Sequence, residues 1–207
     1  TFATPVNFRP AEHGYDLSVH SGTKYLNGHS DIVCGAVIGR KALIEKVTHK
    51  LNHLGGSLDP HAGFLLHRGL KTLALRVRHQ NGSALRVARF LAEQAAVAKV
   101  NYPGLEGHRG HERAKRWYDG FGGMLSFELE DGLDAARRFL AKVMLPLVAP
   151  SLGGPETLVT LPATTSHSGM DPAERRALGI SDGLVRVSVG IEDVEDLVED
   201  FDQALRA

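Results

Sequence analysis

The chain has 207 residues, with 24 Lys and Arg against 24 Asp and Glu, so its formal net charge is zero. A balanced charge gives no global field to attract nucleic acid or an anionic membrane, and we expect neither as a partner. No run approaches the ~20 apolar residues of a membrane-spanning helix, and no charged-then-apolar leader is visible. The single cysteine, Cys34, excludes an intrachain disulfide and favours a reducing compartment, which predicts a cytoplasmic protein.

The first third of the sequence predicts strands followed by helices. Asp16–His20 alternates in polarity like a strand, and the apolar run Asp31–Gly39 predicts a buried one, in which Cys34 is a small core residue rather than a nucleophile. Lys41–Val47 is helical in pattern, and a longer helix follows Asp59–Pro60, where Asp can cap and Pro fits the first turn. This order is typical of the end of an α/β unit.

A change in organisation is predicted near Gly82, because glycine lowers helix stability by roughly 1 kcal/mol relative to alanine. From Ser83 onward, apolar residues recur at helical spacing and leave Arg86 and Arg89 for the solvent face. We therefore expect two domains, residues 1–80 and residues 81–207.

The second of these domains predicts a small α+β unit. Met124–Leu129 has the pattern of a strand and Leu133–Val143 that of a helix. Asp171-Pro172 provides a cap and a first-turn proline for a short helix that Gly179 ends. Glu192–Leu205 predicts a final amphipathic helix with its acids near the start, as the helix dipole favours.

The segment Ser21-Gly22-Thr23-Lys24-Tyr25 is the first candidate for chemistry. A lysine directly after a strand can form a covalent bond with an aldehyde while the hydroxyls of Ser21 and Thr23 hold a phosphate. Pyridoxal phosphate carries both groups. The alternative for Lys24 is a solvated surface lysine, because most lysines are exposed and Ser-x-Thr-Lys alone is a weak pattern.

Two further positions are candidates for contact with a substrate. Arg186 lies in the alternating strand Leu184–Val189, where spacing alone favours a residue on an exposed sheet face, but its planar guanidinium also suits a carboxylate. Ser151 precedes Leu152-Gly153-Gly154, and paired glycines permit either a plain turn or a close approach of the backbone to a ligand.

Histidines are plentiful, but their spacing does not predict a metal site. His108 and His111 are three residues apart with Gly110 between them, and they leave the ligand set short. We therefore expect no metal. His20, beside the lysine segment, is interpreted as structural rather than as an acid or base.

The string His20 to Asp31, which contains Lys24, resembles the cofactor-lysine signature of the Cys/Met-metabolism family of pyridoxal-phosphate enzymes. That family includes cystathionine γ-synthases, cystathionine γ-lyases, methionine γ-lyases and homoserine sulfhydrylases. Further blocks resemble those of the family in the same order: Arg68–Leu73, Tyr102–Leu105, Gly122–Phe127, Ser151–Gly154 and Gly183–Gly190.

The resemblance implies a fold-type-I pyridoxal-phosphate enzyme, with the C-terminal part of the large cofactor domain in residues 1–80 and the small C-terminal domain in residues 81–207. It implies that Ser21 and Thr23 hold the cofactor phosphate and that Lys24 is catalytic and bonds the cofactor. Arg186 becomes the substrate-carboxylate arginine, and Ser151 lies near that carboxylate and Lys24. The implied reaction is γ-elimination or γ-replacement on a sulfur amino acid or an O-acyl-homoserine.

The chain departs from the family pattern in ways that affect its activity. The family's aspartate on the pyridine nitrogen lies just before the segment that matches Thr1, and the ring-stacking aromatic lies earlier still. We therefore expect a missing N-terminal half to complete the enzyme, with a non-catalytic assembly protein of the same fold as the alternative. Pro150 replaces an acid found before Ser151 in some relatives. The family also implies a homotetramer built from dimers.

Overall fold

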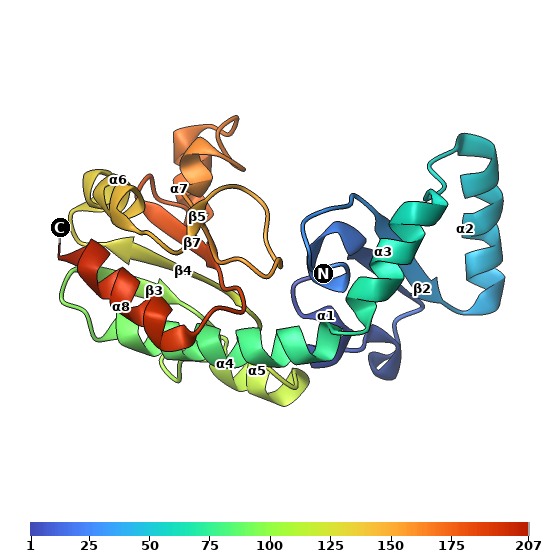
Figure 1. Cartoon of the computed structure of the whole chain (residues 1–207), viewed down its shortest axis with the longest axis horizontal. Coiled ribbons are helices and arrows are strands. Elements are labelled where there is room, and N and C mark those ends of the chain that lie inside the picture. The colour runs from blue at the N-terminus through green and yellow to red at the C-terminus, as the bar shows by residue number, and fades with distance from the viewer. Residues whose placement is uncertain (207) are drawn as a thin grey trace.

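A computed structural model describes residues 1–206 and consists of two groups of elements joined by one long helix. The N-terminal group surrounds a two-stranded sheet, and the C-terminal group surrounds a five-stranded sheet. Helix α4 (Leu73–Ala92) runs from one group to the other (Figure 1). Buried clusters lie within the C-terminal group and at the junction of the two. The protein is therefore of mixed α/β class.

The N-terminal sheet is an antiparallel pair of β1 (Leu17–Ser21) and β2 (Gly35–Gly39). The predicted strand at β1 is confirmed, but the prediction of a buried strand over Asp31–Gly39 is wrong. β2 begins at Gly35 and is largely exposed, with Ile38 54% accessible, although Ala36 packs against the buried cluster at the junction. Cys34 precedes the strand and is half-buried rather than part of a core.

Two short helical turns precede β1, namely α1 (Thr4–Asn7) and η1 (Pro10–His13). Two longer helices follow β2, namely α2 (Lys41–Leu54) and α3 (Pro60–Leu70). The predicted Asp59 cap is confirmed, because its carboxylate accepts hydrogen bonds from the N–H groups of His61 and Ala62, each at 3.0 Å. Such a cap contributes roughly 1 kcal/mol. Within residues 1–206, no helix combines the length and apolar character needed to cross a bilayer.

Helix α4 passes through the position where a change of organisation is predicted. It runs unbroken from Leu73 to Ala92, so the predicted helix start at Ser83 is wrong. Gly82 is exposed, and its intrinsic cost is outweighed by the burial of apolar residues on both sides of it. The division into residues 1–80 and 81–207 stays a prediction, with α4 as the element that the two parts share.

The C-terminal sheet has the strand order β3-β4-β7-β6-β5. Its pairs are antiparallel except for β5 with β6. The strands are β3 (Val97–Asn101), β4 (Met124–Leu129), β5 (Leu147–Val148), β6 (Leu158–Thr160) and β7 (Leu184–Ser188). Shorter helices connect them: α5 (His111–Trp117), η3 (Pro162–Thr164) and α7 (Pro172–Ala177), the last with the predicted Asp171 cap.

One face of this sheet is covered by α4, α6 (Gly132–Lys142) and α8 (Val194–Leu205). Phe127 of β4 lies opposite Val185 of β7, and both are fully buried. Because strand residues alternate between faces, Arg186 lies on the opposite face of the sheet. The loop between β5 and β6 extends toward the N-terminal group (Figure 1).

We expect replacement of Phe201 by alanine to lower the free energy of unfolding by about 3–5 kcal/mol, because it removes a large buried ring. Phe201 is fully buried and meets Phe139 edge-on with the ring centroids 5.3 Å apart. Denaturant unfolding measures the effect. The control Leu178→Ala, at a side chain that is 66% exposed, should change stability by no more than about 0.5 kcal/mol. Equal losses in both variants would contradict the assignment of this core.

Candidate functional site

Lys24 lies in a tight turn, η2 (Gly22–Leu26), directly after β1. Its backbone is non-helical, with φ −91° and ψ −130°, while its neighbours follow a wide helical turn. The turn packs closely against Cys34, so that a side chain in place of Gly22 would collide with Cys34 Sγ. This geometry directs the Lys24 side chain to the loop after β5, where its Nζ donates to Ser151 Oγ at 2.8 Å.

Ser151 has a positive φ of 89°, which is uncommon for a residue that carries a Cβ. The loop is held on both sides of this residue. Leu152 is buried in the junction cluster, and Gly153 N–H donates to Ser188 Oγ at 2.9 Å. Non-glycine residues in this region cost roughly 1–3 kcal/mol and persist where their surroundings fix them, often at functional sites.

Arg186 approaches the same loop from the middle of β7. Its Nη2 donates to the Ser151 carbonyl oxygen at 2.7 Å, and the side chain is half-buried rather than on an exposed sheet face. The buried Nε atom has no hydrogen-bond partner among the described residues. The Nε–H is therefore a buried donor whose hydrogen bond is not made within the described residues.

Residue 151 thus brings two cationic side chains together. Lys24 reaches its hydroxyl, and Arg186 reaches its carbonyl. In the part of the chain that the structure describes, neither cation is in an ion pair with a carboxylate. Burial lowers the pKa of Arg186, but a guanidinium stays protonated at any physiological pH. The site therefore has a net positive charge and suits an anionic ligand.

Ser21 and Thr23, the predicted phosphate ligands, lie on either side of Gly22 at the start of the turn. Thr23 Oγ1 donates to the Cys34 carbonyl at 3.3 Å and accepts from the Cys34 N–H at 3.0 Å. Ser21 is half-buried, and its backbone N–H donates to the Thr1 hydroxyl at 3.0 Å. Lys24 fits the aldehyde of pyridoxal phosphate because its hydrogen-bond partner is a neutral hydroxyl, whereas the Thr23 hydroxyl would have to exchange its bond to the Cys34 carbonyl for one to the phosphate.

The titratable neighbours of Lys24 are held neutral. Burial raises the pKa of Tyr25 to about 12, so its phenol stays protonated and does not act as a base. Burial also lowers the pKa of His20, which shares a hydrogen bond of 2.9 Å with Ser18 Oγ. Burial raises the pKa of the Cys34 thiol, which disfavours the thiolate that a nucleophile requires.

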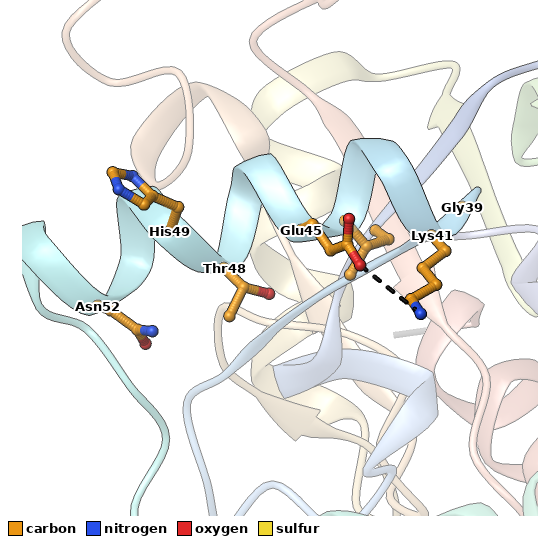
Figure 2. A pocket seen from close by; sticks show the side chains of 7 residues that line it. Gly39, Lys41, Glu45, Thr48, His49 and Asn52 are labelled. Carbon is orange, nitrogen blue, oxygen red and sulfur yellow. Dashed lines mark ion pairs between the residues drawn. The ribbon is translucent and has the colours of Figure 1, made fainter.

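His111 and the hollow along α2 lie apart from the residues that the sequence predicts for the site. His111 Nδ1 contacts the Pro103 carbonyl at 2.9 Å, and within residues 1–206 no three His, Cys, Asp or Glu side chains gather as metal ligands. A hollow of about 500 Å³ lies along α2. It contains a Lys41–Glu45 ion pair of 3.8 Å and none of the predicted site residues (Figure 2).

Sequence reasoning missed several residues that hold the site. Arg76 and Gln80 of α4 are 5% and 0% exposed, and both contact the segments that carry Lys24 and Ser151. Ser188 of β7 is another such residue, because its hydroxyl accepts the hydrogen bond of the Gly153 N–H. A signal for the helix residues exists, because both fall on the stripe that Leu73, Val77 and Ala84 also occupy.

The chain is similar to known proteins along its whole length. Residues 1–206 match the family model described as Cys/Met metabolism PLP-dependent enzyme. The chain is 44% identical over 207 residues to cystathionine γ-synthase 1, chloroplastic, from Arabidopsis thaliana, covering 100% of the chain and 37% of that protein. It is 46% identical over 211 residues to L-methionine γ-lyase from Pseudomonas putida, covering 100% of the chain and 52% of that protein.

A solved structure is similar along the whole chain. It is cystathionine γ-synthase from Xanthomonas oryzae pv. oryzae in complex with aminoacrylate and cysteine, with a TM-score of 0.96 and 44% identity. The match covers 100% of this chain and 54% of that one. The chain thus spans about half the length of several proteins that it matches, and 37% of the Arabidopsis synthase.

The fold and these similarities place the chain in a class of pyridoxal-phosphate-dependent enzymes. More specifically, it belongs to the Cys/Met-metabolism family of these enzymes, whose members include lyases and synthases. The family resemblance that the sequence predicts is confirmed, and so is the cofactor class.

Proposed function

We propose that this chain is the catalytic-lysine portion of a fold-type-I trans-sulfuration enzyme that performs γ-elimination or γ-replacement on a sulfur amino acid or an O-acyl-homoserine. The observation that carries the proposal is a pair of hydrogen bonds to Ser151. Lys24 Nζ donates to its hydroxyl at 2.8 Å, and Arg186 Nη2 donates to its carbonyl at 2.7 Å. One cation is a primary amine and the other a guanidinium, which are the groups needed for an aldehyde cofactor and a carboxylate substrate.

Lys24 has two roles in this proposal. Its Nζ would hold the cofactor aldehyde, while Ser21 and Thr23 would hold the phosphate. The chemistry that pyridoxal phosphate would supply when bound is an electron sink next to the substrate's α-carbon. The freed Lys24 Nζ would then serve as the base that removes the α-proton and as the group that moves a β-proton, as loss of a γ-substituent requires.

Arg186 orients the substrate through its carboxylate. A guanidinium donates two parallel hydrogen bonds to a carboxylate, and this fixes both the position and the direction of the α-carbon. The Ser151 carbonyl holds the guanidinium in place through Nη2. The Ser151 hydroxyl meanwhile keeps the Lys24 amine on the same side of the site.

The complete enzyme requires a portion like the remainder of the relatives, since the chain covers only 37% of the Arabidopsis synthase and 54% of the Xanthomonas chain. We propose that this portion supplies the pyridine-nitrogen aspartate and the stacking aromatic, and that the assembly is a homotetramer of dimers in the cytoplasm. Light scattering on the complete protein tests the tetramer. A stable monomer would contradict it.

Within the family, the choice among cystathionine γ-lyase, cystathionine γ-synthase, methionine γ-lyase and homoserine sulfhydrylase chemistry is tested with substrates. The complete protein is incubated separately with cystathionine, with methionine, and with O-acyl-homoserine plus cysteine or sulfide. We expect a keto acid or a new thioether in at least one mixture, identified by mass spectrometry. If no mixture reacts, although the cofactor is bound at Lys24, the trans-sulfuration assignment is wrong.

The rival from another class is an assembly or regulatory protein that keeps the fold without catalysis. The observation that favours it is coverage, because the chain matches only 37% of the Arabidopsis synthase and 54% of the Xanthomonas chain. The two are separated by light absorption, because a cofactor bonded to Lys24 absorbs visible light. A colourless protein, after reconstitution with cofactor and the missing portion, would support the rival.

A further inference from the structure

Helix α4 carries two buried polar side chains, Arg76 and Gln80, that project from the same side of the helix. They are four residues apart, which places them one turn from each other. Arg76 is 5% exposed and Gln80 is fully buried. A buried guanidinium without a carboxylate must be compensated by other acceptors, so the groups that each side chain contacts indicate its role.

Arg76 holds the turn that carries Lys24. Its Nη1 donates to the Tyr25 carbonyl at 3.1 Å, and its Nη2 donates to the carbonyls of Gly69 at 2.8 Å and Asn27 at 3.4 Å. The turn closes tightly on the guanidinium, because a side chain at Gly28 would collide with it. The backbone immediately after Lys24 is therefore fixed to α4 by one side chain.

Gln80 holds the loop that carries Ser151. Its Nε2 donates to the Gly154 carbonyl at 2.9 Å. The same loop rests on the ring of Tyr25, since a Cβ at Gly153 would lie 2.9 Å from Tyr25 Cδ2. The loop is far from Lys24 in sequence. Gln80 nevertheless holds it from the same part of α4 from which Arg76 holds the turn of Lys24.

We propose that Arg76 and Gln80 are positioning residues that together set the distance between Lys24 Nζ and Ser151 Oγ from one turn of α4. The inference rests on the proposed function, because it assigns a purpose to that distance. A helix is a rigid support, and a site held from a helix is more precise than one held by loops alone. Misplacement of a reacting group by 1 Å can reduce the rate by about 100-fold, so such a support affects turnover directly.

The test replaces each side chain by methionine, which has a similar length but lacks the N–H donors, in the complete protein. Hydrogen–deuterium exchange is measured over residues 22–28 and 151–154, together with kcat, KM and the yield of borohydride-fixed cofactor on Lys24. We expect Arg76→Met to speed exchange in residues 22–28 and to lower the yield at Lys24. We expect Gln80→Met to speed exchange in residues 151–154 and to lower kcat/KM about tenfold, with the yield at Lys24 retained.

The double variant Arg76→Met/Gln80→Met should lose less kcat/KM than the product of the single losses, because both residues act on one distance. Matched controls lie outside the site, one on α4 and one just after its C-terminal end. Arg86→Met removes a surface pair with Glu195, and Gln94→Met removes a contact with the Phe90 carbonyl. Both controls should leave exchange in the two segments and kcat/KM within about twofold of the parent. If Arg76→Met does not fold, Arg76→Lys takes its place, since it keeps the charge but cannot span three carbonyls.

Two outcomes are kept apart by the measurements. If Lys24 of the parent protein carries no fixed cofactor, the proposed function fails, while the exchange data still report whether α4 holds the two segments. If the parent is labelled and the two variants match the controls in exchange and in kcat/KM per folded protein, the positioning roles are wrong. Lower thermal stability alone would indicate a merely structural contribution and would also overturn the inference.

Discussion

Replacement of Lys24 by alanine is expected to lower turnover by at least about 10³-fold and to remove the visible absorption of the bound cofactor. Proton transfer by a positioned side chain alone typically contributes 10²–10⁴-fold, and this variant also loses the covalent attachment. No described lysine other than Lys24 donates a hydrogen bond to Ser151. The two losses, of colour and of turnover, should therefore occur together.

The attachment is measured by borohydride reduction of the complete protein, followed by digestion and mass mapping. The peptide that contains Lys24 should carry a pyridoxyl group in the parent and no such group in Lys24→Ala. Lys41→Ala is the matched control, because Lys41 lies on the surface of α2 and pairs only with Glu45. A pyridoxyl group on another lysine of the parent, with Lys24 unmodified, would refute the assignment.

Much of the fold could be predicted because local signals and tertiary packing agree. The caps at Asp59 and Asp171 mark the starts of α3 and α7, and the alternation of Met124–Leu129 gives the buried face of β4. The prediction failed at β2, because an apolar run predicts burial only if another element covers it. It failed again at Gly82, where the local cost of glycine is small beside the packing of a helix 20 residues long.

The site could be predicted only in part. The segment around Lys24 is continuous in sequence, so its chemistry is visible without a structure. The approach of Ser151 is different, because it lies 127 positions from Lys24 and spacing gives no measure of that distance. Arg76 and Gln80 were missed for another reason. Their contacts with the two site segments are to backbone carbonyls, which every residue has and which no side-chain pattern indicates.

Substitution of Arg186 by lysine is expected to raise the substrate KM about 10- to 100-fold while the cofactor stays bonded to Lys24. Lysine keeps the positive charge but loses the planar pair of donors, and a hydrogen bond to a charged group contributes about 1.5–3 kcal/mol. The Ser151 carbonyl also holds the guanidinium through Nη2 at 2.7 Å, and a lysine ammonium cannot keep that contact and donate two parallel hydrogen bonds to a carboxylate.

Kinetics with an active substrate and with its decarboxylated amine analogue test this role of Arg186. The parent should favour the carboxylate substrate strongly, and Arg186→Lys should reduce that preference by the same factor by which KM rises, because only carboxylate binding has changed. Arg89→Lys, at an exposed position of α4, is the control and should match the parent. An unchanged preference in Arg186→Lys, or a loss of cofactor from Lys24 without a change in KM, would show that the guanidinium does not bind the substrate carboxylate.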